Sequence, residues 1–368
     1  MRSLSIMIKP VSGACNMRCR YCFYADVMAR REVTVYPKMS LETLECVVRR
    51  AFRYADGPIG FAFQGGEPTL IGLPFFEAFM RFVREYNTRR QPVRCAVQTN
   101  GYALSDEMID FFAREQFLLG VSLDGTQQDH DRMRMDANGN PTYDVIHGTM
   151  RRLSKAGVEF NILCVVNAYV AQHPKEVFSA LAPYRYIQFI PCLDDLEGNS
   201  AEYSLTPEDH LAFQKTTFDL YYAAMKAGKP VSVRSFDNYV GILLGMPPEN
   251  CAMGGRCAEN YLIESDGGVY PCDFYVLDEW KLGNIRETPF HRLGATALAR
   301  AFRAESEPVP EECRRCRWYA YCRNGCKRER DPATGRNKWC ECNRSFFAHA
   351  HPKLVELAEV IRRRETNA

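Results

Sequence analysis

Three cysteines near the start of the chain, Cys15, Cys19 and Cys22, form the pattern C-x3-C-x2-C directly after an apolar, strand-like opening. Three thiolates in this spacing can hold three irons of a [4Fe-4S] cluster and leave the fourth iron without a protein ligand. A metal with an open position can bind a reactant, whereas a structural metal site is closed. The motif therefore predicts a cluster that takes part in chemistry.

A second set of thiols lies between residues 251 and 342. It comprises Cys251, Cys257, Cys272, Cys313, Cys316, Cys322, Cys326, Cys340 and Cys342. Eight of these nine thiols can fill two complete four-thiolate sites, which could hold two structural zinc ions or two iron–sulfur clusters. The other four of the sixteen cysteines are scattered, and we expect them to be small buried hydrophobes. They are Cys46, Cys95, Cys164 and Cys192.

The composition is that of a soluble globular protein, with 368 residues of which 46% are apolar and 25% charged. This length allows one large domain and a smaller one. The formal net charge of +2 gives no electrostatic argument for a nucleic-acid or membrane partner. No apolar run reaches the roughly 20 residues of a membrane span, and the N-terminus lacks the features of a signal peptide. Sixteen cysteines without an export signal predict a cytoplasmic protein with metal or cluster ligands rather than disulfides.

From Leu4 to about Asp194 the chain alternates short apolar strands with helical segments. The expected strands are Leu4–Ile8, Ile59–Phe63, Val93–Val97, Leu118–Leu123, Glu159–Val166 and Tyr186–Ile190. Helices are expected between them, for example at Ser40–Tyr54 and Leu73–Glu85. Six strand–helix units joined by right-handed crossovers predict an α/β fold, a partial (β/α)6 TIM-type barrel.

In such barrels the functional site lies at the carboxyl ends of the strands. Polar groups follow each expected strand here, namely the Cys15 loop, Gln64–Pro68, Gln98–Gly101, Ser122–Gly125, Asn167 and Cys192–Asp194. The pair Gly65-Gly66 is either a simple turn or bare backbone presented to a ligand amine. Arg134 is either a solvated surface residue or the partner of a ligand carboxylate. Their joint placement predicts a ligand site on the rim that carries the three thiols.

Three features together resemble the radical S-adenosylmethionine superfamily. They are the C-x3-C-x2-C motif after the first strand, Tyr21 before the last cysteine, and Gly65-Gly66-Glu67-Pro68 after the second strand. The resemblance covers residues 1–235 and implies that S-adenosylmethionine binds the open iron and is cleaved to a 5'-deoxyadenosyl radical. The cofactor-binding residues that it implies are Tyr21, Gln64, Gly65, Gly66, Glu67, Ser122, Arg134 and Leu193. Gly65 to Glu67 would receive the methionine amine and Ser122 and Arg134 the carboxylate. Tyr21 and Leu193 would flank the adenine.

The cysteines of residues 236–368 resemble the SPASM extension of radical enzymes that modify peptides, a cysteine-rich α+β domain. This resemblance implies two auxiliary [4Fe-4S] clusters, and three clusters in all. The first auxiliary cluster would be held by Cys251, Cys257, Cys272 and Cys326. The second would be held by Cys313, Cys316, Cys322 and Cys340, with Cys342 as the alternative to Cys340. A hairpin with its turn at Asp266–Gly268 is expected before Cys272.

Five segments make the chain similar to the anaerobic sulfatase-maturating enzymes. They are Phe61–Thr69, Gln98–Gly101, Glu159–Val166, Tyr203–Leu205 and Glu264–Val276. Members of that family oxidise a cysteine or serine of an unfolded sulfatase, in a Cys/Ser-x-Pro/Ala-x-Arg sequence, to Cα-formylglycine. The resemblance implies the same reaction here, with Asp273 as the base and Tyr24 aligning the target residue. The alternatives are a hydrogen-bonded loop carboxylate for Asp273 and a packed aromatic ring for Tyr24.

The expected partners are a sulfatase polypeptide and a flavodoxin- or ferredoxin-type electron donor, and we expect a monomer. Two other hypotheses stay open at this point. A radical maturase that forms a thioether or carbon–carbon crosslink in a ribosomal peptide would use the same three clusters, although we expect no leader-binding extension before Cys15. A zinc-stabilised binding protein would be colourless, whereas three clusters require about twelve irons per chain. The sequence does not distinguish cysteine from serine as the target.

Overall fold

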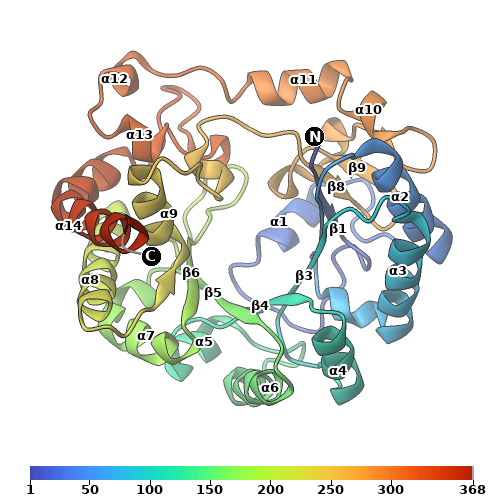
Figure 1. The fold of residues 1–368 in the computed structure, drawn as a ribbon, viewed down its shortest axis with the longest axis horizontal. Coiled ribbons are helices and arrows are strands. Elements are labelled where there is room, and N and C mark those ends of the chain that lie inside the picture. Colours follow the sequence, from blue (N-terminus) through green and yellow to red (C-terminus); the bar gives the residue numbers. More distant parts are fainter. Residues whose placement is uncertain (367–368) are drawn as a thin grey trace.

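The computed structural model describes residues 1–366. Within them, one ten-stranded sheet has the order β10-β9-β8-β1-β2-β3-β4-β5-β6-β7 (Figure 1). The strands are β1 (Leu4–Ile8), β2 (Ile59–Phe63), β3 (Val93–Thr99), β4 (Leu118–Ser122), β5 (Phe160–Val166), β6 (Tyr186–Pro191), β7 (Ser232–Val233), β8 (Tyr261–Ile263), β9 (Gly268–Tyr270) and β10 (Gly283–Asn284). The six predicted strands are β1 to β6, and neighbours in this series pair in parallel. The predicted partial (β/α)6 barrel is confirmed.

Fourteen α-helices accompany the sheet in residues 1–366, and most of them pack around the outside of the barrel (Figure 1). They are α1 (Phe23–Ala29), α2 (Leu41–Tyr54), α3 (Leu73–Tyr86), α4 (Asp106–Arg114), α5 (Gln127–Met133), α6 (Tyr143–Ala156), α7 (Pro174–Leu181), α8 (Pro207–Lys226), α9 (Arg234–Leu243), α10 (Phe290–Leu293), α11 (Ala297–Ala304), α12 (Glu311–Arg314), α13 (Tyr319–Cys322) and α14 (Cys340–Thr366). Ser40, Ser105 and Thr206 cap α2, α4 and α8 by accepting from the amide three residues on. None of the helices in residues 1–366 is long and apolar enough to cross a membrane.

The core behind the strand ends is rich in aromatic rings. Phe63 of β2 packs edge to face against Phe76 and Phe79 of α3, with ring centroids 5.1 and 4.9 Å apart. Such pairs add about 0.5–1.5 kcal/mol each to the free energy gained from burial. The four scattered cysteines are buried among apolar side chains, as predicted. This packing holds the strands rigidly, so the loops at their carboxyl ends have fixed starting points.

The C-terminal, cysteine-rich part joins the barrel through the sheet. The predicted hairpin is β8 and β9, with Gly267 in its turn at φ +88°. Strand β8 pairs in parallel with β1, so the first strand of the barrel is covered on both edges. The predicted boundary between residues 235 and 236 falls inside α9, where the chain is continuous helix. The division into residues 1–235 and 236–368 stays a prediction.

The segment that carries α10, α11 and α12 crosses the side of the ring opposite β4, at the top of Figure 1. It runs from the β8–β9 hairpin to α13 and α14. Helix α14 packs against α8 and α9, where Phe346 contacts Phe218 and Phe236 at centroid distances of 5.6 and 6.0 Å. The C-terminal part therefore spans the open side of the partial barrel.

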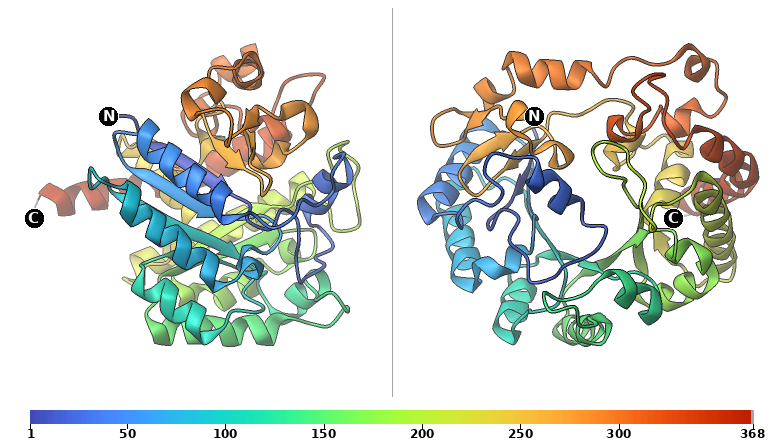
Figure 2. Two further views of the ribbon diagram at one scale, coloured as in Figure 1. Left: turned by 90° about the vertical axis from the view of Figure 1, so that its right-hand side faces the viewer. Right: turned by 180° about the vertical axis from the view of Figure 1, so that it is seen from behind.

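Helix α1 and the loop before it lie inside the ring of helices, both in Figure 1 and in the right view of Figure 2. This loop carries the three N-terminal cysteines. Two main-chain hydrogen bonds of 2.8 Å anchor this loop. The Met39 amide donates to the Pro10 carbonyl, and the Arg18 amide donates to the Met135 carbonyl. The loop that carries the thiols thus lies inside the ring of helices, after the carboxyl end of β1.

Candidate active site

The three N-terminal thiols lie close together on the loop between β1 and α1. The Cys15 sulfur accepts from the Met17 amide at 3.4 Å and from the Asn100 side-chain amide at 3.6 Å. Burial raises the pKa of Cys19 to about 11, and the nearby thiols of Cys22 and Cys15 raise it as well. Asn100 follows β3, and the sequence motif gave no reason to place it against Cys15. Its contact ties the rim of the barrel to the thiol loop.

Gly65 and Gly66 form the turn after β2, and they allow it to approach the thiol loop closely. Gly65 has φ +126°, and a Cβ on Gly66 would lie 2.0 Å from the Ala14 carbonyl oxygen. The Gly66 amide donates to the Ser12 carbonyl at 3.0 Å, and the Glu67 amide donates to the Ala14 carbonyl at 2.8 Å. Because an ammonium group needs acceptors, the carbonyl oxygens of this turn are the atoms that could bind a ligand amine.

Glu67 is buried, and its carboxylate is engaged within the protein. Oε1 accepts from the hydroxyls of Thr69 and Thr99 at 2.5 and 2.8 Å, and Oε2 accepts from the Asn100 amide at 2.7 Å. Burial raises the pKa of Glu67, while these donors lower it. The resemblance implied that Glu67 receives a ligand amine. In the structure its carboxylate joins the turn after β2 to the end of β3, and its role toward a ligand amine stays a prediction.

Arg134 and Tyr21 converge on Asp124, which the sequence analysis placed on the rim without a ligand role. The Arg134 Nε atom donates to Asp124 Oδ2 at 2.9 Å, and the Tyr21 hydroxyl donates to the same oxygen. Nη1 of Arg134 also lies 3.9 Å from the Cys19 sulfur. The Arg134 side chain is only 8% exposed, so it is not a solvated surface residue. Its charge is fixed between a carboxylate and the thiol loop.

Ser122 and Leu193, the other two predicted cofactor residues, lie at the end of β4 and just after β6. The Ser122 hydroxyl accepts from Gln98 Nε2 at 3.3 Å. Both residues are partly exposed on the rim that carries Arg134. Tyr203, from the loop after β6, packs edge to face against Tyr21 at 6.5 Å. The predicted carboxylate and adenine residues therefore lie beyond the carboxyl ends of several strands of the same sheet.

Asp273 lies at the start of the short helix η5 (Asp273–Tyr275) and meets two residues of the barrel. Its Oδ2 atom accepts from the Tyr24 hydroxyl at 2.6 Å and from Gln64 Nε2 at 3.0 Å. Gln64 Nε2 also lies 2.7 Å from the Tyr24 oxygen. Within residues 1–366, Asp273 Oδ1 is buried and has no hydrogen-bond partner. Burial raises the pKa of Asp273, while Lys9 and the Tyr24 hydrogen bond lower it.

Lys9 is a fully buried cation beside this group. Its Nζ atom lies 4.5 Å from the centre of the Tyr24 ring and 3.7 Å from Glu264 Oε2. Arg31 donates to the same Glu264 oxygen at 2.8 Å. Charges are buried in proteins only where other charges compensate them. The cluster of Lys9, Arg31 and Glu264 therefore holds Lys9 in its position against the Tyr24 ring. The sequence analysis missed Lys9, because a lone lysine after a strand carries no motif.

The four thiols predicted for the first auxiliary cluster line one cavity. They are Cys251, Cys257, Cys272 and Cys326. Burial raises the pKa of Cys272 and raises that of Cys326 to about 12, and in each case the amide two residues later lowers it. Amides that donate to sulfur are among the groups by which proteins hold and tune iron–sulfur clusters. The donor set of this cavity fits a four-thiolate cluster.

The thiols predicted for the second auxiliary cluster also form a group. The thiols of Cys313 and Cys322 both raise the pKa of Cys340, after the larger effect of burial. The Cys342 thiol instead lies 3.5 Å from Gln214 Oε1 of α8, and the charges that act on it are those of Glu208 and Lys215.

Across the part of the chain that the structure describes, no three His, Cys, Asp or Glu side chains are placed to hold a single metal ion.

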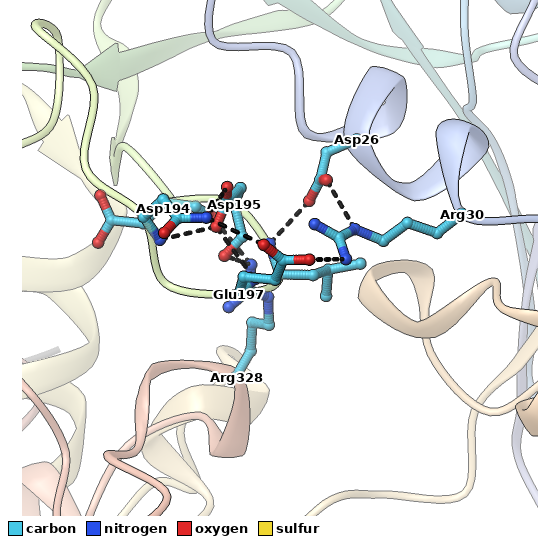
Figure 3. A network of polar contacts seen from close by, with 8 residues as sticks. Asp26, Arg30, Asp194, Asp195, Glu197 and Arg328 are labelled. Carbon is cyan, nitrogen blue, oxygen red and sulfur yellow. Dashed lines mark hydrogen bonds and ion pairs between the residues drawn. The ribbon is translucent and has the colours of Figure 1, made fainter.

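The loop at residues 194–199 joins the barrel to the C-terminal part (Figure 3). Arg30, which directly follows α1, donates to Glu197 Oε1 at 2.9 Å. From η7 (Lys327–Glu329), Arg328 donates to the carbonyls of the first two loop residues at 2.8 and 2.7 Å. An open cavity beside this loop is lined by Arg30, Leu196, Tyr275, Leu277, Glu279 and Trp280. Tyr275, which lines this cavity, ends the short helix that Asp273 begins.

Comparison with known proteins identifies the origin of this arrangement. Residues 10–179 match the model of the radical SAM superfamily, and residues 251–317 match that of an iron–sulfur cluster-binding domain named SPASM. The chain is 42% identical to the cysteine-type anaerobic sulfatase-maturating enzyme of Clostridium novyi, with 99% of this chain and 100% of that protein covered. The chain belongs to the anaerobic sulfatase-maturating enzymes. It is a radical SAM enzyme, as its sequence motifs predicted.

Two further relatives place this sulfatase-maturating enzyme within its family. It is 29% identical to a serine-type enzyme from Bacteroides thetaiotaomicron, with 96% of this chain and 91% of that protein covered. A solved structure of anSMEcpe with bound AdoMet and Cp18Cys peptide matches with a TM-score of 0.93 and 39% identity, covering 98% of this chain and 100% of that one. Iron–sulfur clusters and S-adenosylmethionine are the cofactors of the enzyme, and this replaces the zinc hypothesis.

Proposed function

We propose that the enzyme oxidises a cysteine of an unfolded sulfatase polypeptide, in a Cys-x-Pro/Ala-x-Arg sequence, to Cα-formylglycine. The observation that carries this proposal is the placement of Asp273, whose Oδ2 is held by two donors from the barrel while Oδ1 is buried without a partner. The choice of cysteine follows the relatives, since the cysteine-type enzyme is 42% identical and the serine-type enzyme 29%.

The thiol groups define where the cofactors would be held. Cys15, Cys19 and Cys22 would hold the cluster that binds S-adenosylmethionine, whose carboxylate would pair with Arg134. The two C-terminal thiol groups would hold the auxiliary clusters. When bound, these cofactors supply a 5'-deoxyadenosyl radical, which takes a hydrogen atom from Cβ of the target cysteine, and an acceptor for one electron from the resulting substrate radical.

Asp273 takes the remaining proton. The target cysteine loses a hydrogen atom from Cβ, a proton from its thiol and one electron, and becomes a thioaldehyde. The proton goes to Asp273 Oδ1, because Oδ2 already accepts from Tyr24 and Gln64. Water then replaces the sulfur, which leaves as hydrogen sulfide, and the product is formylglycine. Burial raises the pKa of Asp273, which suits a carboxylate that must gain a proton.

Tyr24 and Gln64 orient this acid. Both donate to one oxygen of Asp273, so they fix the plane of the carboxylate and direct the other oxygen away from themselves. Gln64 was predicted to bind the cofactor, but its contacts favour this orienting role. The 5'-deoxyadenosyl radical is unselective, so the enzyme depends on holding the reacting groups in the correct geometry, and this positioning accounts for much of the rate.

The open cavity beside the loop at residues 194–199 is where we propose that the peptide approaches Asp273. It is lined by Arg30 after α1, by Leu196 of this loop and by Tyr275 of η5, so a peptide lying there would contact both parts of the chain. We further propose a flavodoxin- or ferredoxin-type electron donor, a monomeric enzyme and a cytoplasmic location, where the thiols that must bind iron stay reduced.

Anaerobic reconstitution with iron, sulfide, S-adenosylmethionine and a reductant tests the proposal. Two sulfatase peptides that differ only in cysteine or serine at the target position are supplied, and mass spectrometry reads the product. We expect formylglycine from the cysteine peptide, with one deoxyadenosine for each formylglycine. Deoxyadenosine without a modified peptide would instead favour the ribosomal-peptide maturase. Faster conversion of the serine peptide would overturn the choice of target.

A further inference from the structure

Lys327 directly follows Cys326 and places its ammonium group in a cage of three aromatic rings. The Nζ atom lies 3.5 Å from the centre of the Phe302 ring, 4.6 Å from that of Tyr275 and 4.9 Å from that of Trp280. The side chain is only 7% exposed. Lysine is almost never buried to this extent unless another group compensates its charge, and aromatic faces attract such a cation.

The cage borders the cavity lined by the four thiols of the first auxiliary site. Lys327 and Phe302 both line this cavity. Tyr275 lies close enough to three of the thiols to interact with them electrostatically. Burial raises the pKa of Tyr275, and the charges of Cys326, Cys272 and Cys257 raise it further. The cation therefore lies in the wall of the site and not on its outer surface.

The counter-charge of Lys327 faces the solvent. Glu305 Oε2 accepts from Nζ at 2.8 Å, but the Glu305 side chain is 53% exposed, so water screens its charge. Arg330 also lines the cavity, but its guanidinium donates to several main-chain carbonyls, including that of Ser306 at 2.7 Å, and so holds the loops together. Lys327 makes one main-chain contact, to the Phe302 carbonyl at 3.4 Å.

We propose that Lys327 is a fixed positive charge that raises the reduction potential of the iron–sulfur cluster held by Cys251, Cys257, Cys272 and Cys326. Reduction adds one electron to a cluster that already carries four thiolates, and a buried cation nearby stabilises that added charge. The role of this higher potential in the reaction rests on the proposed function. The electron that the substrate radical loses is gained by an acceptor, and a higher potential makes this transfer more favourable.

A redox titration of the full chain tests this charge. Cys15, Cys19 and Cys22 are replaced by serine in all samples, so that only the auxiliary clusters contribute to the electron paramagnetic resonance signal. We expect Lys327→Met to shift one of the two midpoint potentials to a more negative value. Lys327→Arg keeps the charge and should stay at the value of the unaltered residue. Glu305→Gln removes the counter-charge on the solvent side and should shift the same potential to a more positive value.

Iron analysis accompanies each titration. Equal potentials in the Lys327→Met and Lys327 proteins, at equal iron content, would overturn the proposal. The same conclusion would follow if Lys327→Arg shifted the potential as far as Lys327→Met, or if Lys327→Met lost one cluster, because the residue would then act through packing. The Glu305→Gln shift tests the charge without disturbing the cage. These measurements need neither peptide nor S-adenosylmethionine, so their result is independent of whether formylglycine is formed.

Discussion

The Tyr24 hydroxyl donates to Asp273 Oδ2 at 2.6 Å across 249 residues of sequence. One partner belongs to the helix that follows the three N-terminal thiols, and the other directly follows Cys272 of the first auxiliary site. This hydrogen bond, with that of Gln64 to the same oxygen, connects the part of the enzyme proposed to start the reaction with the part proposed to remove the electron. The proposed proton acceptor lies between them.

Tyr24→Phe removes this hydrogen bond and leaves the ring over Lys9 in place. We expect formylglycine production to fall about tenfold, because a lost hydrogen bond to a charged group costs roughly 1.5 kcal/mol. The cofactor sites are untouched, so iron content and S-adenosylmethionine binding should be unchanged. Quantitative mass spectrometry of the peptide under single-turnover conditions measures the loss.

Tyr86→Phe is the matched control, because the Tyr86 hydroxyl donates to Glu45 Oε1 at 2.5 Å between two helices on the outside of the barrel. It should leave the rate unchanged. An unaltered rate in Tyr24→Phe would show that Asp273 needs no orienting donor from α1.

Gly66→Ala tests the close contact between the turn after β2 and the thiol loop. The added Cβ would lie 2.0 Å from the Ala14 carbonyl oxygen, which is main chain and cannot move aside cheaply. We expect loss of about four irons per chain, because the loop that carries Cys15 to Cys22 is displaced. Gly60→Ala on β2, where the nearest atom would be 3.9 Å away, should keep the full iron content. Full iron content in both variants would refute the steric argument.

Arg134→Met removes the cation that bridges Asp124 and the thiol loop. We expect the dissociation constant of S-adenosylmethionine to rise roughly 10- to 100-fold, since a charge-assisted contact to a carboxylate is worth about 1.5–3 kcal/mol. Equilibrium binding to the reconstituted enzyme measures this change. Arg132→Met, which alters an exposed arginine over the Tyr169 ring, should leave the constant unchanged. Equal affinities in the two variants would remove Arg134 from the binding site.

Cys340→Ser and Cys342→Ser separate the two candidate ligands of the second auxiliary cluster. Cys340 interacts with Cys313 and Cys322, whereas the Cys342 thiol contacts Gln214 of α8. We therefore expect about eight irons per chain in Cys340→Ser and about twelve in Cys342→Ser. The reverse pattern would assign the cluster to Cys342.

The strands of the barrel could be predicted because each is a short apolar run that ends at polar residues. The positions of β1 to β6 follow from that pattern, and so does the rim on which the thiols lie. The pairing of β8 with β1 could not be predicted in this way, because it joins segments more than 250 residues apart and depends on how the two parts pack. Local sequence patterns predict where a strand lies, whereas the strand that pairs with it is determined by the packing of the whole chain.

The site shows the same division. The spacing of the cysteines predicted the thiols, and the resemblance implied Asp273 and Tyr24. Asn100 and Asp124 were placed on the rim without their contacts, and Lys9 was missed. Each of these three is a single polar group after a strand, a position where most such groups only form turns. Their roles depend on side chains that meet from different strands, and no spacing along the chain encodes such a meeting.

The ratio of formylglycine to deoxyadenosine in Asp273→Asn tests the central claim most directly. Asparagine keeps the shape of the side chain but cannot take up the thiol proton at Oδ1. The account predicts that the variant keeps all three clusters and still forms deoxyadenosine with the cysteine peptide, while formylglycine falls at least 100-fold, a change of roughly 2.7 kcal/mol in the barrier. Formylglycine at the unaltered enzyme's ratio to deoxyadenosine would contradict it.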